Sequence, residues 1–304
     1  MKALILSLAL SPVLHAQAPG VEIFDQSRKG LQREESAIAD QAKALASNEK
    51  LLTLDAAFSL IENPTPVNLT LPKARTREAR PAEIAEMARQ SGYRVGWAYL
   101  CNNCDRWHVN LAGGYAVTED GVIATCAHVV QTDRKKMRSG GLIAVDHTGK
   151  VHPVTSILAL DRKIDGALLK IDAHTNALPL NDQIAPGDAA FCLSRPLKQG
   201  RYFTRGMVNR FFWDSEDRSD DLNSLKALGA LKLNVSTRWA PGSSGSAVLD
   251  HCGNAIGHVA TISTMGNQGN RQDNDKSGRT LITLHTATPA RAMIALASLK
   301  PQQD

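Results

Sequence analysis

The sequence has no long apolar run, few cysteines and little excess charge, and each absence excludes a class of protein. No stretch of the 304 residues reaches the roughly 18 to 20 apolar residues that a membrane-spanning helix needs. Five cysteines are too few for a small domain built on disulfides. A formal net charge of +5 is too small to require nucleic acid as a partner. With 43% hydrophobic and 21% charged residues, the chain is globular in composition and not disordered.

Residues 1–18 have the layout of a secretory signal peptide. A basic Met-Lys start precedes an apolar stretch that is too short to span a membrane, and Ala16-Gln-Ala18 fits the small-residue pattern of a cleavage site. Cleavage after Ala16 is an alternative, because Pro19 is unfavourable directly after a cut. We therefore predict an exported protein, periplasmic or secreted, in which cysteines can form disulfides.

Residues 19–92 read as a helical extension and linker. Apolar residues recur every seven positions from Phe24 to Leu52, which is the period of an amphipathic helix with a narrow apolar stripe. We expect one or two helices docked on the main domain, followed by a polar linker over residues 72–80. A further short helix is predicted over residues 81–90, with proline in its first turn.

From residue 93 onward, short apolar and β-branched runs alternate with Gly, Asp and Asn turns. This spacing predicts antiparallel strands in a barrel or sandwich. The expected strands include residues 95–100, 107–111, 115–118, 122–125, 167–171 and 189–193. A short C-terminal helix is expected to begin at Pro289.

Two segments carry a histidine and an aspartate in settings that suit catalysis. His128 ends the β-rich run Ala-Thr-Cys-Ala-His, and its imidazole can accept a proton from a hydroxyl and return it near neutral pH. Asp165 directly precedes an apolar strand, from which its carboxylate can accept a hydrogen bond from the other ring nitrogen. A structural histidine and a turn aspartate are the simpler interpretations, and Asp161 competes for the role of Asp165.

A third segment, Pro-Gly-Ser-Ser-Gly-Ser, carries Ser244 in a loop that leads into a strand. Gly242 and Gly245 permit tight turns that a Cβ would obstruct. Such a turn exposes one hydroxyl and directs successive N–H groups into a shared hollow, which can stabilise the oxyanion of an acyl-transfer intermediate. Taken alone, a flexible Gly/Ser hairpin is the simpler interpretation.

The chain order His128, Asp165, Ser244 is that of chymotrypsin-like enzymes. At these residues the sequence resembles trypsin-like serine proteases, and within them the HtrA/Deg-type branch, here without PDZ domains. Ala-Thr-Cys-Ala-His-Val-Val is similar to the family's Thr-x-x-His-Val-Val. Asp-Gly-Ala-Leu-Leu-Lys is similar to its Asp-(Leu/Ile)-Ala-x-(Leu/Ile)-Lys, and Pro-Gly-Ser-Ser-Gly-Ser-Ala-Val to its Gly-Asn-Ser-Gly-Gly-Ala-Leu. The resemblance covers about residues 93–299.

The resemblance implies an all-β fold with two six-stranded antiparallel β-barrels, a short C-terminal helix and an N-terminal helical extension. The implied domains are a signal peptide over residues 1–18, the extension over 19–92, a first barrel with His and Asp over 93–177, and a second barrel with Ser plus the C-terminal helix over 178–304.

The same resemblance implies a serine endopeptidase, a hydrolase that cuts peptide bonds of extracytoplasmic proteins through a Ser-His-Asp triad and an acyl-enzyme. The amides of Gly242 and Ser244 would form the oxyanion hole, and Ala260, Thr261 and Ile262 would line the S1 pocket. The partner would be a protein or peptide substrate, without cofactor, metal or nucleic acid, and a homo-oligomer stays open. The alternative is a weak or inactive protease homologue that acts as a protein-binding module.

Departures from the family pattern carry further expectations. Ser243 stands where trypsin has an aspartate that pairs with a freshly cut N-terminus, so that activation switch is expected to be absent. Gly166 replaces the usual aliphatic residue after the aspartate and is expected to loosen the strand start. Ile262 stands where trypsin has glycine, which favours small or aliphatic substrate side chains. Arg238 lies near the position of the specificity charge, although a solvent-facing arginine is the simpler interpretation.

The cysteines allow more than one chemistry. Cys101-Asn-Asn-Cys104 lies between two predicted strands, and in an exported protein a disulfide between these two is the favoured interpretation. Zinc binding with His108 is an alternative without an evident fourth ligand, and dithiol redox chemistry is a competing function. Cys126 is expected to be a buried free thiol. A pair between Cys192 and Cys252 is also considered.

Overall fold

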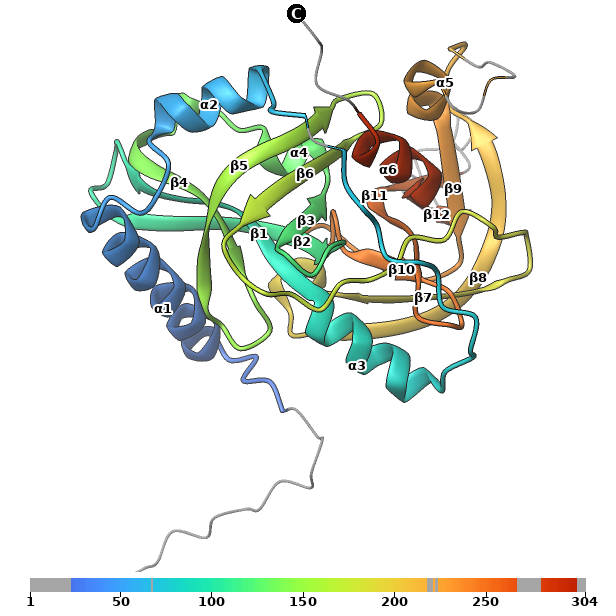
Figure 1. Ribbon diagram of the computed structural model, residues 1–304. Helices are drawn as coiled ribbons and strands as arrows, with labels where there is room; N and C mark the ends of the chain where they lie inside the picture. Colours follow the sequence, from blue (N-terminus) through green and yellow to red (C-terminus); the bar gives the residue numbers. More distant parts are fainter. Residues whose placement is uncertain (1–22, 67, 218–220, 222–223, 267–279, 300–304) are drawn as a thin grey trace, which may run out of the picture.

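The computed structural model describes residues 23–66, 68–217, 221, 224–266 and 280–299, and the expected signal peptide over residues 1–18 lies outside them. Two closed six-stranded antiparallel barrels lie side by side, with short helices around them (Figure 1). This is the chymotrypsin-like architecture that the sequence predicts. No helix within the described ranges is long and apolar enough to cross a membrane.

The first barrel closes in the strand order β1-β2-β3-β6-β5-β4. β-branched and aliphatic side chains such as Val95, Ile123 and Leu169 fill its interior, which is the environment that favours these residue types in strands. The strands are β1 (Gly92–Cys101), β2 (Trp107–Ala116), β3 (Val122–Thr125), β4 (Met137–Val145), β5 (Val151–Asp161) and β6 (Gly166–Ile171).

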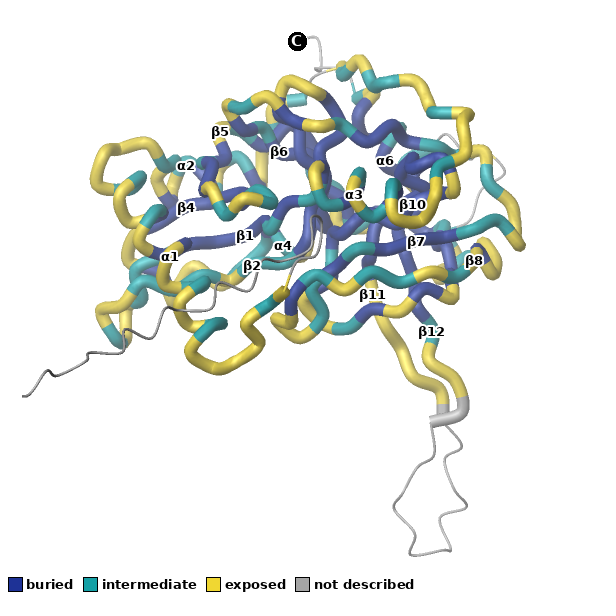
Figure 2. Tube along the Cα trace, turned by 90° about the horizontal axis from the view of Figure 1, so that it is seen from below, coloured by how far each residue is buried: buried dark blue, intermediate teal, exposed yellow. Residues whose placement is uncertain are grey.

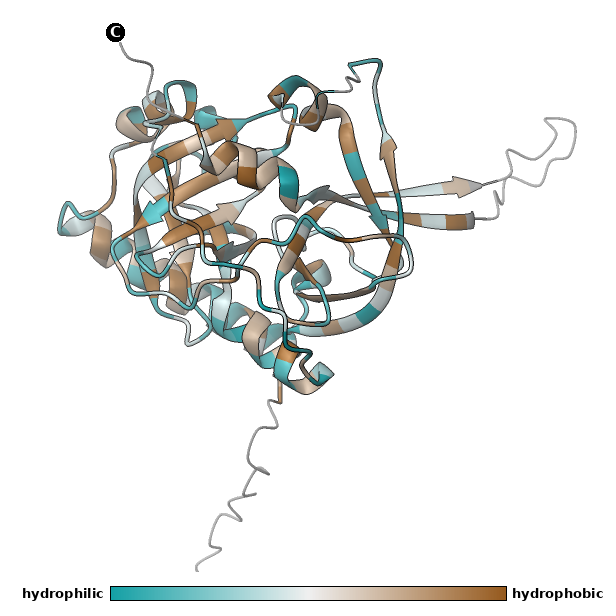
Figure 3. Cartoon of the chain, turned by 45° about the vertical axis from the view of Figure 1, so that its right-hand side comes forward, coloured by the Kyte–Doolittle hydropathy of each residue, from teal (hydrophilic) through white to brown (hydrophobic). Residues whose placement is uncertain are grey.

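The second barrel closes in the order β10-β11-β12-β9-β8-β7 around a smaller apolar core that includes Val208, Leu233 and Ile256. Its strands are β7 (Ala189–Ser194), β8 (Tyr202–Trp213), β9 (Leu231–Val235), β10 (Ala247–Leu249), β11 (Ala255–Gly266) and β12 (Thr280–Pro289). The distal part of the β11–β12 hairpin projects from the body and is exposed (Figures 2 and 3).

Two helices of the N-terminal extension pack on the first barrel. α1 (Arg28–Ser47) lies against β2 and β4, and α2 (Leu54–Glu62) lies against β4 and β5 (Figure 1). The hydroxyls of Ser27 and Thr53 cap the two helices by accepting amide hydrogen bonds. Ile38 from the seven-residue repeat is buried against the barrel. The narrow apolar stripe therefore serves docking, as the sequence predicts.

The remaining helices connect the two barrels or carry single functional turns. α3 (Pro81–Ser91) begins at the predicted proline and contacts strands of both barrels, as does α6 (Ala290–Ala297), the predicted C-terminal helix. The others are α4 (Ala127–Val130), α5 (Leu225–Ala230) and the 3₁₀ turns η1 (Arg134–Lys136) and η2 (Pro196–Lys198).

The packing of α6 explains why a glycine stands at position 166, where it was expected to loosen the start of β6. β6 begins at Gly166, and the residue pairs with Asp161 in the sheet. A Cβ at this position would lie 2.8 Å from the Met293 sulfur of α6 and 3.1 Å from a methyl carbon of Ile164. The hydroxyl of Thr288 also donates to the Ile164 carbonyl at 3.0 Å. The glycine therefore lets α6 pack tightly beside the Asp165 turn.

Candidate active site

His128 and Asp165 meet at the edge of the first barrel. His128 lies in α4, the single helical turn after β3, and Asp165 occupies the turn between β5 and β6 with a φ of 57°. The ring Nδ1 of His128 lies 3.0 Å from Oδ1 and 2.9 Å from Oδ2 of Asp165. The backbone N–H of His128 also donates to Oδ1 at 3.1 Å. These contacts fix the orientation of the imidazole.

Each member of this pair shifts the pKa of the other. The hydrogen bond to Asp165 is the main cause that raises the pKa of His128, and burial opposes it. Burial works to raise the pKa of Asp165, but the hydrogen bonds and charge of His128 outweigh it and the pKa is lowered. An ionised Asp165 holds the proton on Nδ1, which leaves Nε2 as the basic nitrogen of the neutral ring.

Ser244 lies in the loop before β10, and main-chain hydrogen bonds tie this loop to both barrels. The Gly113 amide donates to the Ser244 carbonyl at 2.7 Å, and the Gly245 amide donates to the Val259 carbonyl at 2.8 Å. A Cβ on Gly245, which has a φ of 80°, would collide with Thr125 at the end of β3. The Ser244 loop thus lies directly against the segment that leads into His128.

The Ser–His contact itself is open. Among the described residues, the Ser244 hydroxyl forms no hydrogen bond. Catalytic hydrogen bonds are often long before substrate binds, so this geometry does not exclude the role. The structure brings Ser244 to the site without closing the triad.

Two amides are available for an oxyanion. Within the described part of the chain, the N–H groups of Gly242 and Ser244 donate to no protein acceptor. The preceding carbonyl, that of Pro241, accepts from the Leu197 amide at 2.7 Å, which fixes the plane of the Pro241–Gly242 peptide. Gly242 has a φ of 95°, a conformation that glycine adopts at little cost. These features fit the predicted oxyanion hole.

The residue before Ser244 is held by a neutral contact. Ser243 is fully buried, and its hydroxyl donates to the Ser194 hydroxyl at 3.1 Å. A hydroxyl pair thus stands where trypsin uses an ion pair with a new N-terminus. This agrees with the expected absence of that activation switch.

His258 is a functional candidate that the sequence analysis missed. Its Nε2 lies 3.1 Å from the Asp165 carbonyl oxygen, and burial lowers its pKa to about 4, so the ring is neutral and Nε2–H donates. Nδ1 of His258 and the hydroxyl of Tyr115 are buried without partners among the described residues, and the two rings lie 6.3 Å apart. The sequence signal that could have indicated this role is a lone histidine in a buried strand, because a buried histidine needs a hydrogen-bond partner.

Cys126 is the buried free thiol that the sequence predicts. Its sulfur donates to the Val259 carbonyl at 3.1 Å. Burial is the main cause that raises its pKa well above the usual range. The thiol therefore stays protonated, and it contributes packing beside His128 and Asp165 in place of nucleophilic chemistry.

The predicted S1 residues lie in the middle of β11. Ala260 is buried, Thr261 is exposed and Ile262 is 38% exposed. The indole of Trp239, a residue that was not predicted here, donates to the Thr261 carbonyl at 3.0 Å. Arg238 is exposed, which agrees with the simpler interpretation of a solvent-facing side chain.

All five cysteines are free thiols in the structure. Neither the expected Cys101–Cys104 disulfide nor a bond between Cys192 and Cys252 is formed in it. The Cys104 sulfur instead lies 3.0 Å from Nε2 of His108. This hydrogen bond is the main cause that lowers the pKa of Cys104 to about 6.

The two closed barrels, with a His–Asp pair on one and a serine loop on the other, define the chymotrypsin-like class. Within it, residues 112–257 match the family described as trypsin-like peptidase domain. The matched segment is just under half of the chain and contains His128, Asp165 and Ser244. No curated protein matches the sequence. The family match supports a peptidase of the serine protease class.

Proposed function

We propose that the protein is a serine endopeptidase that cleaves extracytoplasmic proteins with the triad Ser244, His128 and Asp165. The observation that carries this proposal is the oriented His128–Asp165 pair facing a serine loop with two free amides. The assignment to the HtrA/Deg-type branch and export of the chain belong to the same proposal, and they rest on the sequence motifs alone.

The geometry supports the following mechanism. The Ser244 oxygen attacks the substrate carbonyl carbon while Nε2 of His128 takes the hydroxyl proton. Asp165 keeps the other ring proton on Nδ1 and stabilises the imidazolium. The carbonyl oxygen becomes an oxyanion that the amides of Gly242 and Ser244 bind, each worth about 2.7–4 kcal/mol. His128 then protonates the leaving amine, and water attacks the acyl-enzyme by the same route in reverse.

The alternative is a weak or inactive protease homologue that binds proteins, and the open Ser244–His128 contact favours it. The decisive experiment compares wild type with Ser244→Ala on casein and on a fluorogenic peptide library. Ser139→Ala, on an exposed part of β4, is the matched control. We expect Ser244→Ala to lower turnover by roughly 10⁴–10⁶-fold and Ser139→Ala to leave it unchanged.

Covalent labelling distinguishes the alternative directly. A fluorophosphonate probe should label wild type at Ser244, as shown by mass spectrometry of the modified peptide. A labelled Ser244→Ala variant would identify a different nucleophile. Wild type that is folded, unlabelled and without turnover would support the binding module. N-terminal sequencing of the protein from an exporting host tests cleavage after Ala18 against cleavage after Ala16.

A further inference from the structure

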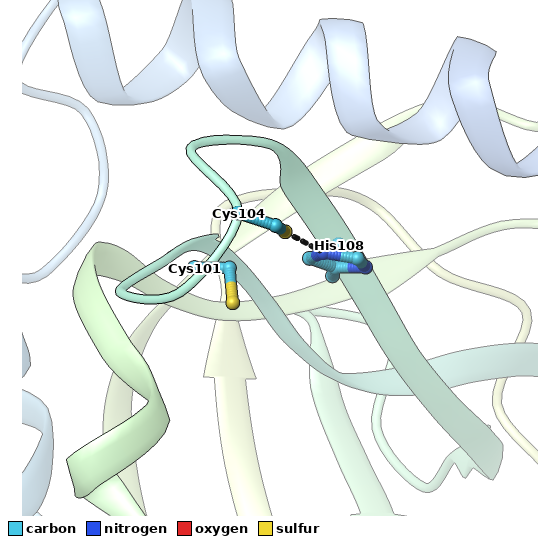
Figure 4. A group of neighbouring side chains, drawn as sticks. All are labelled: Cys101, Cys104 and His108. Atoms are coloured by element: carbon cyan, nitrogen blue, oxygen red, sulfur yellow. Dashed lines mark hydrogen bonds between the residues drawn. The ribbon is translucent and has the colours of Figure 1, made fainter.

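The β1–β2 hairpin carries two cysteines and a histidine, residue types that can bind a metal ion. Cys101 ends β1, Cys104 lies in the turn and His108 is the second residue of β2 (Figure 4). All three side chains are partly exposed. The proposed peptidase mechanism uses none of them.

The three ligand atoms are close enough to share one ion. The sulfurs and a ring nitrogen all lie within 4.8 Å of one another, and Cys104 Sγ is 3.0 Å from His108 Nε2. In a tetrahedral zinc site with Zn–S of about 2.3 Å and Zn–N of about 2.0 Å, ligand atoms lie roughly 3.3–3.8 Å apart. Small side-chain rotations would therefore complete the arrangement.

The backbone already holds the turn in shape without a disulfide. The Cys101 amide donates to the Arg106 carbonyl at 2.9 Å, and the Asn103 amide donates to the Cys101 sulfur at 3.4 Å. Asn102 anchors the turn to η1 through its side chain, which donates to the Lys135 carbonyl at 2.8 Å.

We propose that Cys101, Cys104 and His108 bind one zinc ion, with water in the fourth position. Two thiolates and one imidazole form a donor set that suits zinc. Binding releases one proton from each thiol, and the imidazole binds through its unprotonated Nε2. The described residues contain one other such group, Cys126 with His128 and Asp165, and that group belongs to the catalytic pair.

The test uses the full chain, reduced with a phosphine and stripped of metal by a chelator. We expect it to take up about one zinc per chain by mass spectrometry of the metal content. With cobalt as the probe, we expect the thiolate-to-metal charge-transfer band and the visible bands of a tetrahedral site. Cys104→Ser and His108→Ala should each weaken binding by more than about 100-fold. His174→Ala, which removes an exposed histidine elsewhere, should leave binding unchanged.

Three results would overturn the zinc site. They are failure of the reduced wild type to bind cobalt, a cobalt spectrum without the thiolate band, and a full tetrahedral spectrum in folded Cys104→Ser. Circular dichroism of each variant shows whether a loss of binding reflects unfolding. Because the assay reads metal binding, its outcome does not depend on the proposed peptidase activity.

A separate observation concerns α1, whose Glu34 touches both barrels. One carboxylate oxygen of Glu34 lies 3.1 Å from Arg94 of β1, and the other lies 2.7 Å from Arg195, which follows β7. The next residue, Glu35, pairs with Lys198 at 2.9 Å. The loop from Arg195 to Lys198 is therefore fastened to the N-terminal extension.

That loop in turn contacts the candidate oxyanion hole. Leu197 donates its amide to the Pro241 carbonyl at 2.7 Å, and Leu197 and Lys198 have φ values of 52° and 61°. Residues other than glycine rarely adopt this backbone conformation, so contacts with surrounding residues must stabilise it. Residues of α1, Arg195 and Gly242 also line one cavity of about 560 Å³.

We infer that Glu34 is a positioning residue for the oxyanion hole, an inference that rests on the proposed function. By holding Arg195, it keeps the Leu197 amide on the Pro241 carbonyl and so directs the Gly242 amide toward substrate. Glu34→Ala and Arg195→Ala should each lower kcat about tenfold with little change in KM, because the S1 strand is untouched. Glu62→Ala, which breaks the α2 ion pair with Arg162, is the matched control and should change neither constant.

The double variant Glu34→Ala/Arg195→Ala separates a specific contact from general destabilisation. We expect its kcat to match that of either single variant, because both remove the same contact. Wild-type kcat in Glu34→Ala, or multiplied losses in the double variant, would overturn the inference while the proposed function stands. An inactive wild type would instead contradict the proposed function.

Discussion

The two barrels prepare their parts of the candidate site in different ways. In the first barrel, His128 and Asp165 are held by contacts with each other, and both lie beside strands of one barrel. In the second barrel, Ser244 lies on a loop whose main-chain hydrogen bonds reach Gly113 of the first barrel and Val259 of its own. The side chains of the proposed acid–base pair are thus held mainly by each other, whereas the position of the proposed nucleophile depends on how the barrels meet.

The exposed surfaces of the two barrels also differ. α1 and α2 cover part of the first barrel, whereas the β11–β12 hairpin of the second barrel projects outward (Figure 2). Residues at its exposed part include Ile262, Met265 and Ile282. The two helices therefore support the first barrel, whereas the second barrel presents the surface at which a substrate is expected to bind. Variants that affect only one barrel test this contrast.

Among the variants that test this contrast, the largest effect is expected within the first barrel, from Asp165→Asn. The amide keeps the shape of the side chain but cannot hold the proton on Nδ1, so the imidazole adopts the wrong tautomer. We expect kcat to fall by about 10⁴-fold, measured with a fluorogenic peptide. Thermal unfolding provides the control, since the variant should stay folded. A loss of less than tenfold would remove Asp165 from the triad.

Gly113→Ala should show that the nucleophile depends on the contact between the barrels. A Cβ on Gly113 would lie 2.6 Å from the Ser246 amide nitrogen and would push the Ser244 loop away. A displacement of about 1 Å at a reacting atom can cost about 10²-fold in rate. Gly114→Ala is the matched control, because its Cβ would meet Val95 inside the first barrel.

Each variant should lose about 1–3 kcal/mol of stability to overpacking. We expect urea unfolding to show similar losses, whereas kcat falls about 10²-fold in Gly113→Ala alone. Equal losses of kcat in the two variants would contradict the proposed dependence on the contact between the barrels.

The pH dependence should report the His128–Asp165 pair. The base is neutral His128, so kcat/KM should fall about tenfold per pH unit below its pKa, which Asp165 raises above the usual 6.5. In Asp165→Asn, the residual activity should titrate at lower pH. An unchanged midpoint would show that another group is titrating.

The pair also makes stability depend on pH, with opposite signs for the two groups. The raised pKa of His128 contributes stability that is complete below its unfolded pKa and is lost as pH rises through the folded pKa. The lowered pKa of Asp165 contributes stability above its unfolded pKa, which is lost as pH falls through the folded pKa.

The smallest effect is expected from His258, the residue of the second barrel that supports Asp165. His258→Phe removes the donor to the buried Asp165 carbonyl, which costs about 1–3 kcal/mol of stability. We expect kcat to fall about tenfold, with a partial recovery in His258→Gln, whose amide can donate. Urea unfolding and steady-state kinetics measure the two effects. Identical kinetics in the Phe variant and wild type would limit His258 to a packing role.

The sequence predicted those features that local chemistry determines. The loop around Ser244 requires Gly242 and Gly245 because both adopt positive φ, so its motif is readable without the fold. The prolines at the starts of α3 and α6 are equally local signals. The strands β4, β5 and β9 were not among the expected strands. The segments of β4 and β5 contain glycines or a proline, and neighbouring strands stabilise all three.

Contacts between distant segments explain what the sequence did not reveal. His258 and Asp165 are 93 residues apart, and neither neighbourhood indicates the other. The binding of Glu34 to one arginine from each barrel depends on how the barrels and α1 pack together. His128 was expected at the end of a strand, whereas the structure places it in a one-turn helix after β3. These features can be identified only in the folded structure.

The position of α6 late in the chain determines when the candidate site can be completed during synthesis. α6 is the last helix among the described residues, and its Met293, together with Thr288 of β12, packs behind the turn that carries Asp165. A chain emerges from the ribosome with its N-terminal part first. The Asp165 turn of the first barrel therefore lacks these packing contacts until α6 has been made. A partly synthesised chain would therefore hold the three residues of the proposed triad before the segment that supports the Asp165 turn has been made.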